Sequence, residues 1–504
     1  MPSEPFDYDA LCNHLWEAAN ILRGPVDAAD FKTYIFPLLF FKRVSDAYDE
    51  EAKKALDESG GDEDYAGFAE NHRFQVPEGC HWNEVRKATV NVGQTLQNAL
   101  RAIETANPKT LFGIFGDAPW TNKDRLSDEL LTDLLEHFSS KPLPLANVPA
   151  DALGDAYEFL IKQFADKSNK KAGEFYTPRS VVGLMIRILA PHAGDTIYDP
   201  ACGTGGMLLA AVQYVKQHGG DVRMLLGKLF GQEKNLTTSA IARMNLLLHE
   251  VEDAQVTRGD TLREPKFLDG DALMQFDCVV ANPPFSLEKW GEEKWPSDPY
   301  QRNFAGTPPG KSGDYAWVQH MISSMRPSTG RMAVVLPHGA LFRMAAEGKI
   351  RRKLLEMDLL EAVIGLGPNL FYGTGLAACI LVFRKRKPEA RKRQVLLVDA
   401  SRLFKKGRNQ NELLPAHADR VFQLYTDYAD APGEAKLVSL DDVLTEHGGN
   451  LNISLYVEPP QAEKVPTVAE ALASLKASLA AAYAAEDRLA ELLRQNGLLT
   501  ETPE

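Results

Sequence analysis

Residues 196–215 constrain the fold of this chain more than any other stretch. Residues 196–199 have the character of a short buried strand, residues 200–206 form a glycine-rich turn, and residues 207–215 have helical spacing. This order opens a βαβ unit, and the glycines allow the backbone to approach a ligand closely. Leu208 stands where a dinucleotide fingerprint requires glycine, and no Gly-Lys-Ser/Thr sequence follows. The stretch therefore predicts an α/β fold without a dinucleotide fingerprint or a P-loop.

Polar side chains end the next three predicted strands. Residues 228–233 end in Glu233, whose carboxylate can accept both hydroxyl hydrogens of a ribose. Residues 255–258 are followed by Asp260, which is placed to accept a hydrogen bond from an adenine amino group. The fourth strand, residues 276–281, is followed by Asn282. Four successive strand ends thus have residues suited to binding a nucleoside.

Asn282, Pro283, Pro284 and Phe285 form an unusual tetrad after the fourth strand. The prolines lack N–H donors and stiffen the turn, so the carbonyl groups of Asn282 and Pro283 can point outward as acceptors. Together with the flat ring of Phe285 they suit a planar amino group on a conjugated ring. A plain strand-ending turn is the alternative for the tetrad alone, but the four strand ends outweigh it. A flavin or nicotinamide site would not require the tetrad.

Seven segments resemble the motifs of a known family. They are Gly173-Glu174-Phe175-Tyr176-Thr177-Pro178-Arg179, Asp199-Pro200-Ala201-Cys202-Gly203-Thr204-Gly205-Gly206, the tetrad, Gly313-Asp314-Tyr315-Ala316-Trp317, residues 330–337, Pro368-Asn369-Leu370-Phe371, and Asn450-Leu451-Asn452-Ile453-Ser454 with Tyr456. With these motifs the chain resembles an amino-methyltransferase that uses S-adenosylmethionine. More narrowly, it resembles the modification subunit of type I restriction–modification systems. The resemblance extends over most of the chain after residue 170 and, more weakly, over the helical front.

The resemblance implies a class I S-adenosylmethionine-dependent methyltransferase domain, which is a Rossmann-like α/β fold with seven mostly parallel strands and an antiparallel last strand. Its remaining strands are expected at residues 331–337, 361–365 and 376–384. Apolar residues at helical spacing in residues 11–22 and 31–48 indicate a helical domain in front of it. We expect an N-terminal helical domain at residues 1–150, the methyltransferase domain at residues 151–430 and a C-terminal region with a helical tail at residues 431–504.

The resemblance also implies roles for individual residues. Asn282, Pro283, Pro284 and Phe285 would be catalytic, and no metal would take part. The residues expected to bind S-adenosyl-L-methionine are Glu174, Phe175, Tyr176, Thr177, Pro178, Arg179, Asp199, Ala201, Gly203, Thr204, Gly205, Gly206, Glu233, Asp260 and Thr261.

The tetrad also suggests the chemistry. An exocyclic purine amine is a poor nucleophile because its lone pair is delocalised, and acceptors on both N–H groups would stabilise the charge that develops during methyl transfer. We therefore expect methylation of N6 of an adenine flipped out of DNA. A cytosine-C5 mechanism needs a nucleophilic cysteine, and neither Cys202 nor Cys278 is well placed for that role. Two alternatives remain: another acceptor, such as a protein glutamine or a guanine of ribosomal RNA, and a non-catalytic cofactor-binding subunit.

Composition limits what the chain does alone. A formal net charge of −13 opposes tight unaided binding to double-stranded DNA. The resemblance supplies a specificity subunit as the partner, with two modification chains for each specificity chain, and allows a restriction (nuclease/translocase) subunit as well. No apolar run approaches the ~20 residues that span a membrane. The five cysteines form no CxxC pair, so we expect a reducing, cytoplasmic location.

Three further segments suggest functional interpretations. Residues 286–312 form a long loop rich in aromatic residues, which we expect to cover the flipped base. A dense basic cluster favours either phosphate contact or a solvated hairpin; its members are Arg384, Lys385, Arg386, Lys387, Arg391, Lys392 and Arg393. A helix at residues 468–496 has an apolar stripe that suits packing on its own domain or on a partner; the stripe consists of Leu472, Leu475, Leu479 and Tyr483.

Overall fold

The computed structural model describes residues 7–143, 148–167, 177–371, 374–408, 410–458 and 468–496. The chain divides into two compact units, Met1–Val457 and Glu458–Glu504. Among the described helices, none is long and apolar enough to cross a membrane.

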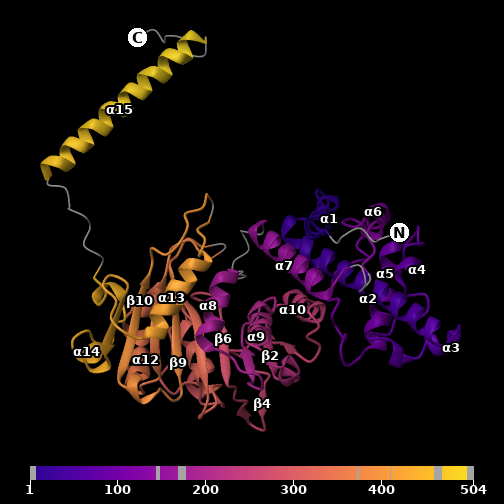
Figure 1. Cartoon of the computed structure of the whole chain (residues 1–504), viewed down its shortest axis with the longest axis horizontal. Coiled ribbons are helices and arrows are strands. Elements are labelled where there is room, and N and C mark those ends of the chain that lie inside the picture. The colour runs from indigo at the N-terminus through magenta and orange to yellow at the C-terminus, as the bar shows by residue number, and fades with distance from the viewer. Residues whose placement is uncertain are drawn as a thin grey trace. The chain divides into compact units, whose positions relative to one another are not determined.

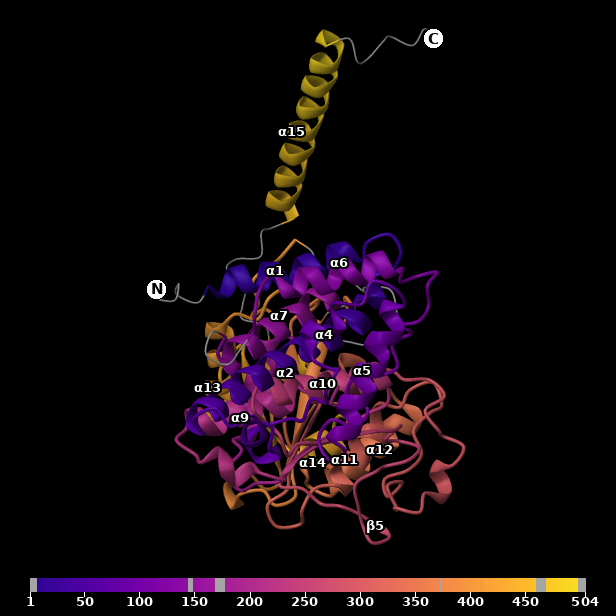
Figure 2. The ribbon, with the colours of Figure 1, turned by 90° about the vertical axis from the view of Figure 1, so that its right-hand side faces the viewer.

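The front of the larger unit is helical, as the spacing of its apolar residues predicts. Its α-helices are α1 (Tyr8–Ile21), α2 (Phe31–Glu58), α3 (Glu63–Ala66), α4 (Trp82–Val85), α5 (Val92–Ala106), α6 (Asp128–Ser139) and α7 (Ala150–Lys167), with short 3₁₀ turns η1 (Ala28–Asp30) and η2 (Ala69–Asn71). Figure 2 shows these helices gathered together, in indigo and purple. The second helix continues ten residues beyond the predicted end at residue 48, because its C-terminal half is a polar helix without apolar spacing.

One hydrophobic core joins this helical front to the following domain. It includes Leu153 and Tyr157 of α7 together with Ile241 and Met244 of α10 (Leu236–Leu248). The Tyr157 hydroxyl donates to the backbone carbonyl of Ile241 at 3.3 Å. Because α10 follows a strand of the sheet, the helical front packs directly against the α/β domain. The domain boundaries at residues 150 and 430 stay predictions.

A nine-stranded, mostly parallel sheet forms the centre of the α/β domain, in the order β11-β10-β8-β9-β7-β6-β1-β2-β3. Its strands are β1 (Ile197–Asp199), β2 (Leu229–Glu233), β3 (Gln255–Arg258), β6 (Cys278–Ala281), β7 (Arg331–Pro337), β8 (Leu360–Leu366), β9 (Ala378–Arg384), β10 (Gln394–Ala400) and β11 (Ala435–Ser439). A separate hairpin pairs β4 (Leu268–Asp269) with β5 (Ala272–Leu273). The predicted fold class is confirmed, including the antiparallel β9 between β7 and β8. β10 and β11 extend the sheet beyond the predicted seven strands.

Helices cover both faces of the sheet (Figure 1). Alternate residues of β6 show why: Cys278 and Val280 join the core on one face, and Val279 and Ala281 join the core on the other. The first face is covered by α8 (Arg179–Leu189), α9 (Gly206–Gln217) and α13 (Pro415–Asp427). The second is covered by α11 (Asp314–Ser323), α12 (Ala345–Glu356) and α14 (Leu440–Thr445). Short 3₁₀ turns complete the domain at η3 (Val222–Leu225), η4 (Trp295–Ser297), η5 (His338–Leu341), η6 (Glu389–Arg391) and η7 (Ile453–Leu455).

The long loop after the tetrad is packed down rather than open. Trp290 and Trp295 are buried in a small core with Leu262 and Trp317. The guanidinium of Arg302 forms a buried ion pair with Asp298 at 2.6 Å. These aromatic side chains therefore stabilise the loop itself, and whether it covers a bound base stays a prediction.

The smaller unit contains one described helix, α15 (Val468–Gln495). It agrees with the helix predicted over residues 468–496. Most of its large apolar side chains are exposed, and the predicted stripe of Leu472, Leu475, Leu479 and Tyr483 is among them.

Candidate active site

The predicted strand ends meet around one cavity of about 480 Å³ at the carboxyl edge of the sheet. Of the predicted site residues, those that line it are Thr177, Arg179, Asp199, Ala201, Gly203, Thr204, Gly206, Glu233, Asp260, Thr261, Asn282 and Pro284. Pro178, Gly205, Pro283 and Phe285 are described but are not part of this lining. Glu174, Phe175 and Tyr176 lie outside the described residues.

The glycine-rich turn shapes one wall of the cavity. Gly203 and Gly205 have φ angles of 54° and 82°, a left-handed conformation that glycine adopts without strain. Gly205 is the residue before the first turn of α9, so the turn directs the start of that helix at the cavity. The Thr261 hydroxyl donates to the Pro200 carbonyl at 2.6 Å and fixes the turn against the loop after β3.

Two carboxylates lie beside the turn. Glu233, at the end of β2, accepts from the backbone N–H groups of Gly203 at 3.1 Å and Asn235 at 2.8 Å. Asp199, at the end of β1, is 1% exposed and accepts from the Ala201 N–H at 3.0 Å. Burial raises the pKa of Asp199 to about 8; the Ala201 N–H opposes the shift and the Glu233 charge adds to it. The cavity therefore favours a positively charged ligand group near Asp199.

Asp260 is less free than the sequence suggests. Its carboxylate lies 2.9 Å from the ammonium of Lys234 and 3.8 Å from the Arg263 guanidinium. The side chain is 19% exposed and lines the cavity, so it can accept one further hydrogen bond beside these pairs.

Asn282 is held in one orientation by a residue far away in the sequence. Its amide nitrogen donates to the Thr177 hydroxyl oxygen at 2.8 Å. Its amide oxygen is buried and has no hydrogen-bond partner among the described residues. Since buried acceptors are almost always paired, this oxygen is a position at which a ligand donor is expected. Thr177, a predicted cofactor contact, lines the cavity and accepts this hydrogen bond from Asn282; its contact with the cofactor stays a prediction.

The rest of the tetrad faces different surroundings. Phe285 packs edge-on against Phe371, with the ring centres 5.8 Å apart. The next residue, Ser286, donates its N–H to the buried carboxylate of Asp314 at 2.7 Å. Asp314 also forms an ion pair with Arg343. These contacts fix the turn in which the tetrad lies.

Sequence reasoning missed several parts of the cavity wall. Phe36 of α2 and Glu158 of α7 line the cavity, so the helical front contributes to it. Arg179 forms an ion pair with Glu158, and Asp155 lies 3.7 Å from the same guanidinium. Trp317 also lines the cavity, and its buried indole N–H has no described partner. The one sequence signal for Trp317 is its position in the family motif Gly313-Asp314-Tyr315-Ala316-Trp317, and that position alone does not indicate a role in the cavity.

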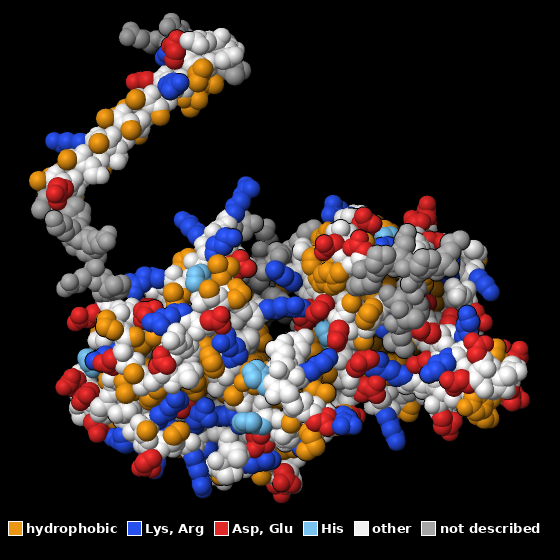
Figure 3. Space-filling model, in the orientation of Figure 1, with side chains coloured by type: hydrophobic (Ala, Val, Ile, Leu, Met, Phe, Trp, Pro, Cys, Tyr) orange, Lys and Arg blue, Asp and Glu red, His pale blue; other side chains and the backbone are white. Residues whose placement is uncertain are grey.

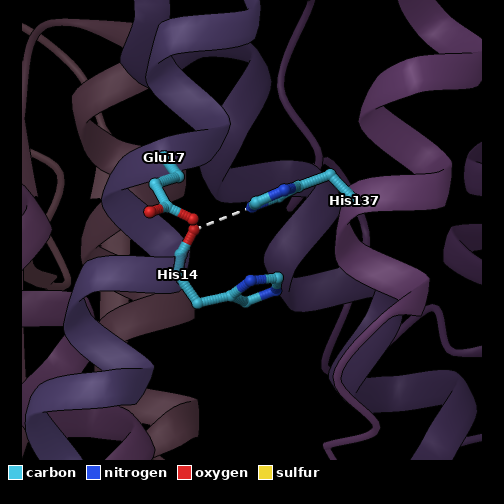
Figure 4. A group of neighbouring side chains, drawn as sticks. All are labelled: His14, Glu17 and His137. Atoms are coloured by element: carbon cyan, nitrogen blue, oxygen red, sulfur yellow. Dashed lines mark hydrogen bonds between the residues drawn. The ribbon is translucent and has the colours of Figure 1, made fainter.

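A second polar group lies in the helical front, away from the cavity lining. Figure 4 shows His14 and Glu17 of α1 beside His137 of α6. The imidazole rings are stacked with centres 4.1 Å apart, and His137 Nε2 donates to the His14 carbonyl at 2.8 Å. Because the two imidazole rings are stacked, their nitrogen lone pairs point in roughly parallel directions and do not converge on one metal ion. We therefore interpret the contact between His14 and His137 as a packing contact that joins α1 to α6.

Comparison with known sequences agrees with this site. A sequence model of the family described as N-6 DNA Methylase matches residues 148–465, and one described as HsdM N-terminal domain matches residues 11–138. The MjaVII type I restriction enzyme methylase subunit of Methanocaldococcus jannaschii is 33% identical over 474 residues, covering 90% of this chain and 78% of that protein. The MpnII methylase subunit of Mycoplasma pneumoniae is 29% identical over 500 residues, covering 89% of each.

Solved structures agree with the sequence comparison. The methyltransferase subunit of a type I restriction-modification system from Streptococcus thermophilus has a TM-score of 0.78 at 30% identity, covering 90% of this chain and 100% of that chain. A modification subunit of a putative type I restriction enzyme from Vibrio vulnificus, at 19% identity, shares the fold with a TM-score of 0.63 and covers 88% of this chain and 94% of that one.

The chain belongs to the N-6 DNA methylase family and, within it, to the methylase subunits of type I restriction enzymes. The resemblance derived from the motifs is thereby confirmed, and with it the class of enzyme, an adenine-specific DNA methyltransferase.

Proposed function

We propose that this chain transfers a methyl group from S-adenosylmethionine to N6 of an adenine flipped out of duplex DNA, with Asn282 as the central catalytic residue. The observation that carries the proposal is the buried amide oxygen of Asn282 beside the cavity, which has no hydrogen-bond partner in the part of the chain that the structure describes. Thr177 holds the amide nitrogen, so the oxygen is left to accept from a substrate N–H.

The amide oxygen of Asn282 and the carbonyl oxygen of Pro283 would accept hydrogen bonds from the two N–H groups of the target amine. These hydrogen bonds strengthen as the nitrogen becomes tetrahedral and gains positive charge, so they stabilise the transition state more than the ground state. Base flipping costs a few kcal/mol. Stacking on the Phe285 ring returns roughly 1–3 kcal/mol. The role of the tetrad is therefore to capture, hold and polarise the adenine.

The cavity residues fit S-adenosylmethionine, which supplies a methyl group on a positively charged sulfur. The Glu233 carboxylate accepts one hydrogen bond from each of two backbone N–H groups. Its remaining lone pairs can accept hydrogen bonds from ribose hydroxyl groups. We expect Asp260, which lines the cavity, to accept from the adenine amino group, and the turn at Gly203 and Gly205 to bring the backbone close to the methionine part. The buried carboxyl of Asp199 suits the positive charge of the ligand.

DNA recognition requires a partner under this proposal. A formal net charge of −13 weakens unaided DNA binding, and relatives named as type I methylase subunits act within restriction enzymes. We expect a specificity subunit that binds two copies of this chain, with a restriction subunit as a further partner. Because the proposed substrate is the cell's own DNA, we expect the chain to be located in the cytoplasm.

Incubation with radiolabelled S-adenosylmethionine tests the function. The chain is assembled with its specificity partner and offered plasmid DNA, RNA or protein, and the labelled product identifies the acceptor. Asn282→Ala should abolish labelling of DNA while calorimetry shows nearly unchanged cofactor affinity. Labelling of RNA or protein instead of DNA, or full turnover by Asn282→Ala, contradicts the proposal. Cofactor binding without transfer to any acceptor would favour the non-catalytic alternative.

A further inference from the structure

Most of the basic cluster that stands out in the sequence is engaged in ion pairs within the fold. Arg384 and Arg391 both pair with the buried carboxylate of Glu361, at 2.6 Å and 3.0 Å. Lys387 pairs with Asp358 at 2.6 Å. Lys392 and Arg393 have carboxylate partners as well. The cluster also lies where β9 ends and β10 begins, which is the edge of the sheet opposite to the tetrad. A phosphate contact close to the target base is therefore expected from residues at the other edge.

A different basic group lies at the edge of the sheet that holds the tetrad. Lys405, Lys406 and Arg408 follow the end of β10, and all three are exposed. None of them has an ion-pair partner among the residues that the structure describes. Lys and Arg side chains project from this end of the sheet domain in Figure 3. We call Lys405, Lys406 and Arg408 the basic turn.

The basic turn is anchored on both sides. The backbone groups of Lys405 and Glu412 exchange hydrogen bonds of 2.8 Å and 2.9 Å, which close the turn. The Gln410 amide donates to the Leu370 carbonyl at 2.6 Å, and the Asn411 amide donates to the Pro368 carbonyl at 2.9 Å. Before the turn, Phe404 packs so closely over Gly367 that a Cβ at that position would lie 2.6 Å from the ring.

These anchors lead directly to the tetrad. Leu370, which accepts from Gln410, precedes Phe371, and the Phe371 ring packs against Phe285. The basic turn and the residue proposed to stack on the target base are therefore attached to one short segment. Their relative position is fixed by the fold and not by a flexible connection.

The sheet also sets the distance between them. β6, β7, β8 and β10 are all parallel, so their carboxyl ends lie at one edge. β10 is four strands away from β6 in the sheet order. At about 4.8 Å per strand, the carboxyl ends of β6 and β10 lie roughly 19 Å apart across the edge. DNA advances about 3.4 Å per base pair, so roughly 19 Å corresponds to about 5–6 base pairs.

We propose that the basic turn binds the phosphate backbone of the duplex about 5–6 base pairs to one side of the flipped adenine. This inference rests on the proposed DNA methyltransferase function and adds a second point of attachment to it. Three exposed cations on an anchored turn suit phosphate oxygens, which give affinity and register without reading sequence. The specificity partner then selects the site while the basic turn aligns the duplex with the tetrad.

The test replaces all three cations: Lys405→Gln, Lys406→Gln and Arg408→Gln in one chain. The matched control makes the same change of charge at the opposite edge of the sheet, with Lys228→Gln, Arg386→Gln and Lys392→Gln. Each chain is assembled with the specificity partner, and its affinity for a target duplex is measured by fluorescence anisotropy over a range of salt concentrations. Methylation kinetics on the same duplex supply KM and kcat.

We expect the basic-turn variant to bind the duplex at least about tenfold more weakly near 0.1 M salt and to reduce the salt slope by about 2–3. KM for DNA should rise while kcat at saturating DNA stays unchanged, and the control should match the wild type. On duplexes trimmed from one end, the wild type should lose affinity once fewer than about 5 base pairs remain beside the adenine, and the variant should not.

Several results would overturn the inference. If the basic-turn variant binds DNA with unchanged affinity and salt slope, and the wild-type complex still methylates DNA, the inference is wrong and the proposed function stands. Loss of assembly with the specificity partner, with DNA binding otherwise normal, would make the basic turn a protein contact instead. Absence of DNA methylation by the wild-type complex would remove the proposed function itself, which is a different failure.

Discussion

At the scale of the single residue, the Thr177 hydroxyl determines which way the Asn282 amide faces. Thr177→Val keeps the shape of the side chain but removes the acceptor for the amide nitrogen, so the amide can rotate away from the substrate amine. A neutral hydrogen bond contributes about 0.5–1.5 kcal/mol. We therefore expect kcat for methyl transfer to fall about 3- to 10-fold, with cofactor affinity measured by calorimetry nearly unchanged.

Thr257→Val is the control for that prediction. The Thr257 hydroxyl is buried and has no hydrogen-bond partner among the described residues, so the same substitution breaks no hydrogen bond between them. Equal losses of kcat in both variants would show that Thr177 acts only through packing.

Asp199 gives a pH dependence at the same scale. Burial first of all raises its pKa to about 8, well above the ordinary 3.8, so near pH 7 the carboxyl is largely protonated in the cofactor-free protein. A positively charged cofactor favours the ionised form, so binding should release a proton and affinity should rise between about pH 6 and pH 8. Calorimetry in buffers of different ionisation enthalpy measures this release, and Asp199→Asn should abolish it. A proton release equal to that of the wild type in Asp199→Asn would assign the titration to another group.

The raised pKa also affects stability. Because the folded cofactor-free chain holds this proton more tightly than the unfolded chain, the contribution of Asp199 is fully present below about pH 4. It is lost as pH rises toward 8. Cofactor binding should reduce this loss, since it stabilises the carboxylate.

At the scale of the element, buried strands were the most predictable part of the fold. β7 (Arg331–Pro337), which is buried along its whole length, begins and ends at the predicted residues. β3 (Gln255–Arg258) does so too, although it is a partly exposed edge strand. β11 (Ala435–Ser439) was missed because its pairing with β10 is not visible in its own sequence. The contact of Thr177 with Asn282 was missed for a related reason, since 105 residues separate the partners.

Glu361 is a buried charged residue in β8, and no pattern in the neighbouring sequence predicts its ion pairs. Its side chain is fully buried and accepts from Arg384, Arg391 and the Tyr425 hydroxyl. Glu361→Gln removes the charge that both guanidinium groups need, and breaking a buried ion pair costs about 3–5 kcal/mol. We expect a markedly lower midpoint of thermal unfolding, measured by circular dichroism.

The exposed pair of Glu389 with Lys392 is the control for β8. Glu389→Gln should change the free energy of unfolding by about 0.5 kcal/mol or less, because exposed ion pairs contribute little. Similar effects of both substitutions would contradict the importance of burial at Glu361.

At the scale of the whole molecule, the cavity depends on the helical front as well as on the sheet. Phe36 and Glu158 line it, and α10 shares its core with α7. The sequence located the strand ends correctly but gave no sign that the helical front lines the cavity, because packing between helices distant in sequence leaves no local pattern.

The second unit, with α15, belongs to the same scale. Leu472, Leu475 and Leu479 are 50%, 56% and 45% exposed, and their spacing of three and four residues makes an apolar seam of the coiled-coil type. A seam this exposed is costly in water, so we expect it to pack on helices of the specificity partner. Deletion of residues 467–504 should abolish assembly and leave cofactor affinity unchanged, as measured by size-exclusion chromatography and calorimetry.

Point variants separate the seam from the helix itself. Leu475→Asp with Leu479→Asp places two charges in the seam, while Ala477→Asp with Ala484→Asp places the same charges on the opposite face of α15. Each burial of a leucine side chain contributes about 1.5–3 kcal/mol, so the seam variant should weaken assembly at least about a hundredfold. The opposite-face variant should assemble normally, because replacing two alanines with aspartates lowers only the intrinsic helix propensity of α15. Assembly of both variants at wild-type affinity would show that the specificity partner binds another part of the chain.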